Sequence, residues 1–257
     1  MALIEFRGVR KAFGPKVVYR HLDLDVQEGE ALTIIGGSGQ GKSVMLKLLI
    51  GLLRVDAGSI TYDGEVVSEL PEEEYGRIRR EVAMLFQGAA LFDSLSVRDN
   101  ITYGLREHHQ LPEEEMAARV AEALEYVGLP GTEEMWPADL SVGMQKRVGL
   151  ARAIAMKPRV LLYDEPTTGL DPINVARISE LIIHLQQSLD VTSIVVTHDM
   201  HSAFLVSDRM AMIQSGRVVF SGTPEEFRQT SEPIVRDFID GNAPEEEDTE
   251  TLLRSVG

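Results

Sequence analysis

GGSGQGKS, residues 36–43, decides the fold of this chain, because it matches the pattern G-x-x-x-x-G-K-[ST] and follows an apolar run, Ala31–Ile35, that predicts a buried strand. Its eight residues are Gly36, Gly37, Ser38, Gly39, Gln40, Gly41, Lys42 and Ser43. Glycines let successive backbone N–H groups converge on an anion, a lysine here can reach terminal phosphates, and the serine hydroxyl can ligate Mg²⁺. The stretch therefore predicts a phosphate-binding loop, followed by a helix that begins at Lys42 and directs its positive end at the phosphates.

The composition indicates a soluble globular protein: 44% of the 257 residues are hydrophobic and 26% are charged. No apolar run approaches the ~20 residues of a membrane helix, and the N-terminus lacks the charged and apolar blocks of a signal peptide. Zero cysteines exclude disulfides and thiolate metal sites. We therefore expect the chain to remain in the cytoplasm.

The net charge of -16 limits the possible partners. A strongly acidic surface repels nucleic acid and anionic lipid headgroups, so nucleic acid is not an expected partner. If the protein acts at a membrane, another protein must hold it there.

Strand patterns occur in two parts of the sequence. Residues Ala2 to Leu32 alternate apolar runs with turn signals and predict a small antiparallel sheet, and Ser59–Tyr62 and Val82–Phe86 continue a β-rich core. Further along, Val160–Tyr163 and Ser193–Thr197 are short and uniformly apolar, as parallel strands covered on both faces tend to be.

Helical patterns dominate from Asp99 to about Lys157, where Glu113–Tyr126 and Gly143–Met156 are the main candidates. This stretch predicts an inserted helical subdomain. The later elements are a crossover helix at Val175–Leu189, a hairpin formed by Met210–Ile213 and Val218–Phe220, and a helix at Pro224–Arg228. We expect one folded domain over residues 1–240, followed by an acidic, solvated tail over 241–257 that contains the run Ala243–Asp248.

Two adjacent carboxylates, Asp164 and Glu165, end the strand that begins at Val160. Such a pair is costly to bury without a cation nearby. Beside a phosphate-binding loop, Asp164 would hold Mg²⁺ and Glu165 would orient or deprotonate the attacking water. The alternative is an exposed pair that caps a strand before Pro166.

His198 and Gln87 also follow predicted strands, and the carboxyl ends of parallel strands face one common crevice. His198 should therefore lie near the terminal phosphate, and the Gln87 amide could touch Mg²⁺ or the water. The alternatives are an ordinary surface or core histidine and an ordinary turn glutamine.

Ser141 precedes Val142 and Gly143 at the start of a predicted helix, where free N–H groups, one hydroxyl and the helix dipole can bind an anion. Local physics alone favours an ordinary serine N-cap at this position.

Taken together, these motifs resemble those of ATP-binding-cassette (ABC) ATPases over nearly the whole chain, to about Asp240. The resemblance rests on Gly36–Ser43, Gln87, Leu140-Ser141-Val142-Gly143-Met144, Asp164-Glu165, Gly169-Leu170-Asp171 and His198, in that order and at family spacing.

This resemblance implies an α/β fold: a P-loop NTPase core with a mixed, mainly parallel sheet, an antiparallel β subdomain and an inserted α-helical subdomain. It further implies a head-to-tail homodimer in which each ATP lies between one chain's phosphate-binding loop and Ser141, Gly143 and Met144 of the other chain. Asp171 would lie across the dimer seam, and Phe13 would stack on the adenine, with core packing as the alternative for Phe13.

A finer resemblance concerns the Mla-type (maintenance of lipid asymmetry) subfamily. It rests on Met84–Leu95, on Met144 and on Arg236–Gly241. Members energise phospholipid movement between the two membranes of a diderm envelope, together with a multispanning permease and a periplasmic lipid-binding component. The resemblance thus implies a cytoplasmic subunit held peripherally on the inner membrane by its permease.

Val142 is one departure from the family pattern, which has glycine there. Valine cannot easily take positive φ or approach a phosphate as glycine can, so we expect an active but slower ATPase. Two other functions remain open: an ATPase of an importer for another solute, such as an amino acid or ion, and a soluble ABC ATPase that acts on DNA, ribosomes or cluster assembly.

Overall fold

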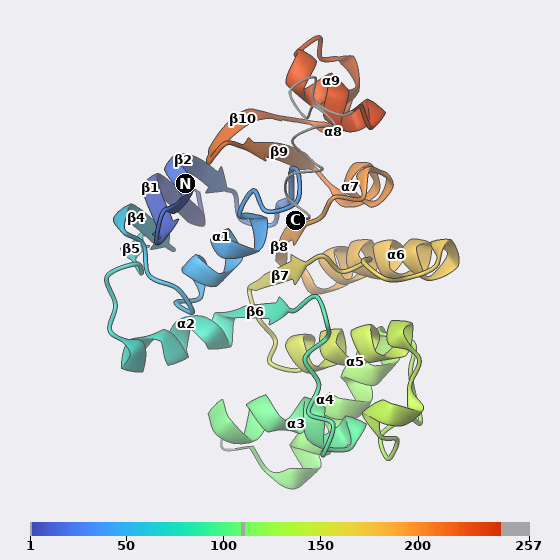
Figure 1. Ribbon diagram of the computed structural model, residues 1–257. Coiled ribbons are helices and arrows are strands. Elements are labelled where there is room, and N and C mark those ends of the chain that lie inside the picture. The colour runs from blue at the N-terminus through green and yellow to red at the C-terminus, as the bar shows by residue number, and fades with distance from the viewer. Residues whose placement is uncertain (1, 109–110, 243–257) are drawn as a thin grey trace, which may run out of the picture.

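A central six-stranded sheet organises the computed structural model, which describes residues 2–108 and 111–242 (Figure 1). Its strand order is β10-β9-β3-β8-β7-β6, and the neighbours pair in parallel except β9 with β10. The strands are β3 (Ala31–Ile35), β6 (Val82–Leu85), β7 (Val160–Asp164), β8 (Thr192–Val196), β9 (Arg209–Gln214) and β10 (Arg217–Gly222). The predicted mixed, mainly parallel sheet is therefore confirmed.

A second, antiparallel sheet lies beside the first, in the order β2-β1-β4-β5. It consists of β1 (Ile4–Phe13), β2 (Lys16–Val26), β4 (Ala57–Tyr62) and β5 (Glu65–Val66). The expectation that antiparallel pairing extends to Leu32 is wrong, because Leu32 belongs to β3 and pairs in parallel with β8 and β9. Every residue of β3 is buried, which is the pattern of a strand covered on both faces rather than one.

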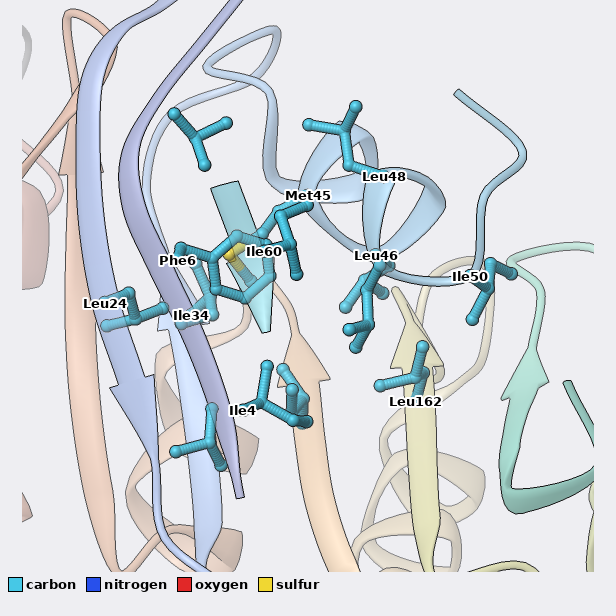
Figure 2. Close-up of a cluster of buried hydrophobic side chains, with 14 of the residues drawn as sticks. Ile4, Phe6, Leu24, Ile34, Met45, Leu46, Leu48, Ile50, Ile60 and Leu162 are labelled. Carbon is cyan, nitrogen blue, oxygen red and sulfur yellow. The ribbon is translucent and has the colours of Figure 1, made fainter. Parts of the chain in front are cut away.

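Helix α1 (Lys42–Leu49) packs between the two sheets. Figure 2 shows Met45 and Leu46 of α1 against Phe6 and Ile60 of the antiparallel sheet, with Ile34 and Leu162 of the parallel sheet in the same cluster. The helix begins at Lys42 as predicted and ends at Leu49. At Gly51, φ is 70° and a Cβ would lie 2.4 Å from the Tyr75 ring, so the chain turns there.

A second core joins the other face of the parallel sheet to four helices: α3 (Val97–His108), α4 (Glu113–Tyr126), α5 (Val142–Ile154) and α6 (Pro172–Leu189). Leu162 of β7 faces the first core, whereas Leu161 and Tyr163 face the second, as the alternation of a strand requires. Strand β7 is thus fixed from both sides, and its carboxyl end has a defined position.

The helices cover both faces of the sheet (Figure 1). They are α2 (Tyr75–Glu81), α3 (Val97–His108), α4 (Glu113–Tyr126), α5 (Val142–Ile154), α6 (Pro172–Leu189), α7 (Met200–Val206), α8 (Pro224–Gln229) and α9 (Pro233–Asp240), with 3₁₀ turns at Glu72–Glu74 and Pro137–Asp139. Helices α3, α4 and α5 lie together below the sheet in Figure 1, where the helical subdomain is expected. The subdomain limits at 99 and 157 stay predictions, and the expected acidic run Ala243–Asp248 lies outside the described residues. Throughout the described part of the chain, no helix has the length and apolar character needed to cross a membrane.

Candidate nucleotide-binding and catalytic site

The phosphate-binding loop connects β3 to α1 and is shaped by glycines at two close approaches. A Cβ on Gly36 would lie 2.4 Å from the Ile213 carbonyl oxygen, and one on Gly41 would lie 2.3 Å from Val18. Gly36 and Gly41 also have φ values of 152° and 95°, which other residues rarely adopt. The Tyr19 hydroxyl donates a hydrogen bond of 2.6 Å to the Gly41 carbonyl. The curved loop is therefore held from outside by neighbouring strands.

Lys42 directs its ammonium group back into the loop. Its Nζ donates to the carbonyls of Gly36 at 2.8 Å and Gly37 at 3.2 Å, and it lies 3.7 Å from the Glu165 carboxylate. Burial lowers the pKa of Lys42, and the negative charge of Glu165 opposes that shift. A cation thus stands within the ring of backbone groups that the sequence predicts to bind phosphate.

Asp164 ends β7 directly beside the loop, and only 5% of its surface is exposed. The Ser43 hydroxyl donates to Asp164 Oδ1 at 2.5 Å. Burial raises the pKa of Asp164, and the nearby Glu165 charge adds to that effect, while the Ser43 hydrogen bond opposes it. A buried carboxylate next to a hydroxyl suits a divalent cation, so these two residues fit the expected Mg²⁺. The pair does not form an exposed strand cap.

Glu165 has a left-handed backbone, with φ of 50°, and its N–H donates to the Val196 carbonyl at 2.9 Å. Its carboxylate has several partners: the Thr168 hydroxyl donates to Oε2 at 3.1 Å, and His198 Nδ1 lies 2.7 Å from the same oxygen. These contacts fix the direction of the carboxylate. A non-glycine residue in this conformation is strained, and such strain concentrates at functional sites.

A cavity of about 770 Å³ opens over the loop. It is lined by Phe13, Lys16, Val18, Gly37, Ser38, Gly39, Gly41, Lys42, Ser43, Val44, Gln87, Glu165, His198 and Phe238. The Gln40 side chain instead accepts a hydrogen bond from the Ser215 N–H at 2.9 Å. Phe13 is 44% exposed, so core packing does not account for it. The structure thus brings Phe13, the loop, Gln87, Glu165 and His198 around one space.

Seven predicted site residues are absent from this lining. Gly36, Gln40 and Asp164 belong to the loop or lie beside it, whereas Ser141, Gly143, Met144 and Asp171 lie at the starts of α5 and α6. Ser141 caps α5 by accepting a hydrogen bond from the Met144 N–H at 3.3 Å, and Asp171 caps α6. A Cβ on Gly143 would lie 3.3 Å from the Asn174 side chain, so the starts of α5 and α6 are neighbours. Within one chain, Ser141 acts as the ordinary N-cap that local physics favours.

Several residues around the site, among them Thr168, Lys16 and Phe238, are missing from the site residues predicted from the sequence. Thr168 lies three residues after Glu165 in the sequence, and its hydroxyl donates to the Glu165 carboxylate. This short separation is a sequence signal from which the contact could have been predicted. Phe238 of α9 and Lys16 of β2 line the cavity from distant parts of the chain. Phe238 lies in the segment Arg236–Gly241, which carries the finer resemblance, but nothing in that segment indicates a contact with the nucleotide site.

A family model described as ABC transporter matches residues 19–168, which include the loop and both carboxylates. The chain belongs to the ABC transporter ATP-binding family. The expected resemblance is therefore confirmed, and the chain is an ATP-binding and ATP-hydrolysing subunit of an ABC transporter.

Two curated relatives illustrate the similarity within the ABC family. The "Probable ribonucleotide transport ATP-binding protein mkl" of Mycobacterium leprae is 41% identical over 98% of this chain and 75% of its own length. The "Intermembrane phospholipid transport system ATP-binding protein MlaF" of Haemophilus influenzae is 39% identical over 94% of this chain and 91% of its own length. The chain spans 66% of the mkl protein of Mycobacterium tuberculosis.

Among solved structures, the dimeric post-hydrolysis state of the cassette MJ0796 bound to ADP and Pi superposes with a TM-score of 0.79. The two sequences are 29% identical, and the superposition covers 86% of this chain and 98% of the MJ0796 chain. The α/β cassette fold is therefore shared with an ABC ATPase captured after hydrolysis.

Buried Asp164 predicts that removal of its charge stabilises the nucleotide-free protein. Asp164→Asn should raise the Tm at pH 8 by about 2 to 4 °C, equivalent to roughly 1 kcal/mol, because asparagine can still accept the Ser43 hydrogen bond. Since the pKa is raised on folding, the wild type loses stability as pH rises through that pKa and regains it below. The Tm difference should therefore shrink as the pH falls.

Asp171→Asn is the matched control for this measurement, because Asp171 is exposed and hydrogen bonding by Asn174 lowers its pKa. Asparagine caps helices as well as aspartate, so this variant should show no increase in Tm. An unchanged or lower Tm for Asp164→Asn would contradict the conclusion that burial of the Asp164 charge lowers the stability of the nucleotide-free protein.

Proposed function

We propose that this ABC ATPase drives phospholipid transport between the two membranes of a diderm envelope. The observation that carries the proposal is the similarity to MlaF, which extends over 94% of this chain and 91% of the relative. The cavity supports the chemistry of the proposal, since it places a phosphate-binding loop, Glu165 and His198 around one space.

For hydrolysis, ATP would place its phosphates in the loop near Lys42 and its adenine against Phe13. Glu165 would accept a proton from the water that attacks the terminal phosphorus, as the bond to the leaving ADP oxygen breaks. His198 and Thr168 would hold the Glu165 carboxylate in the required direction. Ser43, Asp164 and Gln87 would hold Mg²⁺, which supplies charge stabilisation to the phosphates.

We propose that two copies assemble head to tail. Ser141, Gly143, Met144 and Asp171 lie outside the cavity of their own chain, at the adjacent starts of α5 and α6. In the second copy they would face this chain's loop and complete the site. The dimeric form of the MJ0796 cassette supports this arrangement.

A groove of about 510 Å³ supports the proposed permease contact. It lies between the parallel sheet and helix α3, and its lining includes Leu52, Phe86, Phe92 and Tyr103. An apolar helix of a multispanning permease would fit such a groove. The permease would hold the chain peripherally on the cytoplasmic face of the inner membrane and link it to a periplasmic lipid-binding component.

Transport of a different solute is the second candidate, because the M. leprae relative at 41% identity is named for ribonucleotide transport. Copurification with the permease, followed by mass spectrometry of the bound small molecules, separates the two. Bound phospholipid supports our proposal. A bound ribonucleotide other than the ATP or ADP of the phosphate-binding loop, with no phospholipid, would reject it. Absence of any membrane partner would favour a soluble ABC ATPase.

Glu165→Gln tests the catalytic assignment. Glutamine retains the size of the side chain and can still accept the Thr168 hydrogen bond, but it cannot act as a base. Turnover should fall by ~10² or more while ATP binding persists, and ATP should shift the variant to a stable dimer on size exclusion. Lys42→Ala should instead lose ATP binding itself. Near-normal hydrolysis by Glu165→Gln would remove Glu165 from the role of base.

Phe92→Glu tests the permease surface. Phe92 is 43% exposed and lies 4.7 Å from the Tyr103 ring, so a charge there should weaken an apolar contact without unfolding the chain. Copurification with the permease should drop at least about tenfold with ATP binding intact. Val66→Glu, at a 41% exposed residue of β5, is the matched control and should not change the yield. Equal yields for both variants would place the contact elsewhere.

Val142→Gly tests whether valine slows the ATPase. Val142 is the first residue of α5, is 55% exposed and is not among the described residues with positive φ. Its side-chain volume, rather than its backbone, is therefore the feature that could keep the partner's phosphate at a distance. We expect the glycine variant to hydrolyse ATP a few-fold faster in the assembled transporter, although glycine costs roughly 0.5 to 1 kcal/mol of helix stability. An equal or lower rate of ATP hydrolysis in the glycine variant would show that Val142 does not slow the enzyme.

A further inference from the structure

Lys146 of α5 is a buried cation to which the mechanism above gives no role. It is 3% exposed, and its Nζ donates to three backbone carbonyls: Pro166 at 2.8 Å, Thr168 at 2.9 Å and Glu165 at 3.3 Å. All three acceptors belong to the turn Glu165–Thr168, which follows β7. The three protons of one ammonium group are therefore used on three carbonyls of a single turn.

The turn that Lys146 contacts determines where the Glu165 carboxylate points. Glu165 has a strained left-handed backbone, and the Thr168 hydroxyl at the other end of the turn donates to its carboxylate. Carbonyls that converge in this way repel one another unless a donor or cation lies between them. Lys146 supplies both, so it stabilises the conformation that directs Glu165 into the cavity.

The surroundings show that Lys146 is expensive to bury. Burial lowers the pKa of Lys146, and the negative charge of Glu165 opposes the shift. A buried ammonium is tolerated when hydrogen bonds satisfy all of its donors, as they do here. An apolar side chain at this position would avoid the desolvation cost but would leave the three carbonyls without their shared donor.

We propose that Lys146 is a positioning residue that fixes the Glu165–Thr168 turn for catalysis and ties it to helix α5. The inference rests on the proposed function, in which α5 begins with the Ser141 segment that serves the partner's ATP. One side chain would then connect the catalytic turn of one site with the phosphate-contacting helix of the other. The two ATP sites of the dimer are mechanically linked through each chain's Lys146.

Arg147 offers a matched control because it is the next residue on the same helix and also donates to backbone carbonyls. Its guanidinium contacts Val127 at 3.2 Å and Gly128 at 3.1 Å, which lie at the end of α4 and not at the catalytic turn. Loss of Arg147 should therefore lower stability without displacing Glu165.

The experiment compares Lys146→Met, Lys146→Arg and Arg147→Met in the purified full-length chain, with kcat, KM, ATP affinity, the Hill coefficient and Tm measured for each. Lys146→Met should lower kcat about 10- to 100-fold, because small misplacements of a catalytic group have effects of that size. Its ATP affinity should stay within about threefold, since the phosphate-binding loop is untouched, and its Hill coefficient should fall toward 1. Lys146→Arg, which retains charge and donors, should recover part of kcat.

The control decides between positioning and simple destabilisation. Arg147→Met should lower Tm comparably but keep kcat within about threefold of the wild type. If Lys146→Met matches Arg147→Met in kcat and Hill coefficient at a similar Tm, Lys146 is merely structural and the proposal is overturned. If Lys146→Met does not fold, Lys146→Gln, with one amide donor group, serves in its place under the same criteria. A wild type without ATPase activity would instead refute the proposed function.

Discussion

The arrangement of this protein depends on the burial of three charged groups at the carboxyl end of β7. Lys42, Asp164 and Glu165 are all nearly inaccessible to solvent, where an isolated charge would cost several kcal/mol. Each has a specific partner: loop carbonyls for Lys42, the Ser43 hydroxyl for Asp164, and Thr168 and His198 for Glu165. The partners come from separate strand ends and helices, so the charges are tolerated only when the whole fold is assembled.

This requirement explains why the scaffold is fixed so firmly around β7. Alternate residues of that strand pack into opposite cores, one containing α1 and the antiparallel sheet, the other containing α5 and α6. Sliding the strand by one residue would exchange the two sets of side chains and displace Asp164 and Glu165 together. The first of these cores also holds α1, whose first residue is Lys42. Hydrophobic packing therefore sets the distance between the cation and the two carboxylates.

The sequence allowed the main features of the site to be predicted, because they are local. The start of α1 at Lys42 follows from glycine spacing, and the strand that ends at Asp164 follows from a short apolar run. The buried strand Ala31–Ile35 was predicted, but the antiparallel sheet was extended into it as far as Leu32, because alternation and uniform burial are hard to distinguish beside a hairpin. Lys146 and Phe238 were missed because their roles depend on contacts with residues distant in sequence, which no periodicity encodes.

In the proposed dimer, helix α5 would serve two sites without large movements. Its first turn is free to meet a ligand of another chain, since Ser141 caps it and Val142 is exposed. Its second turn is bound to its own chain, because Lys146 is hydrogen-bonded to the catalytic turn. A rigid helix transmits a displacement of its first turn to its second with little loss, whereas a flexible loop would absorb it. In the proposed dimer, a displacement at Ser141 would therefore reach Glu165, and a partner that docks correctly at one site would adjust the position of the proposed base at the other.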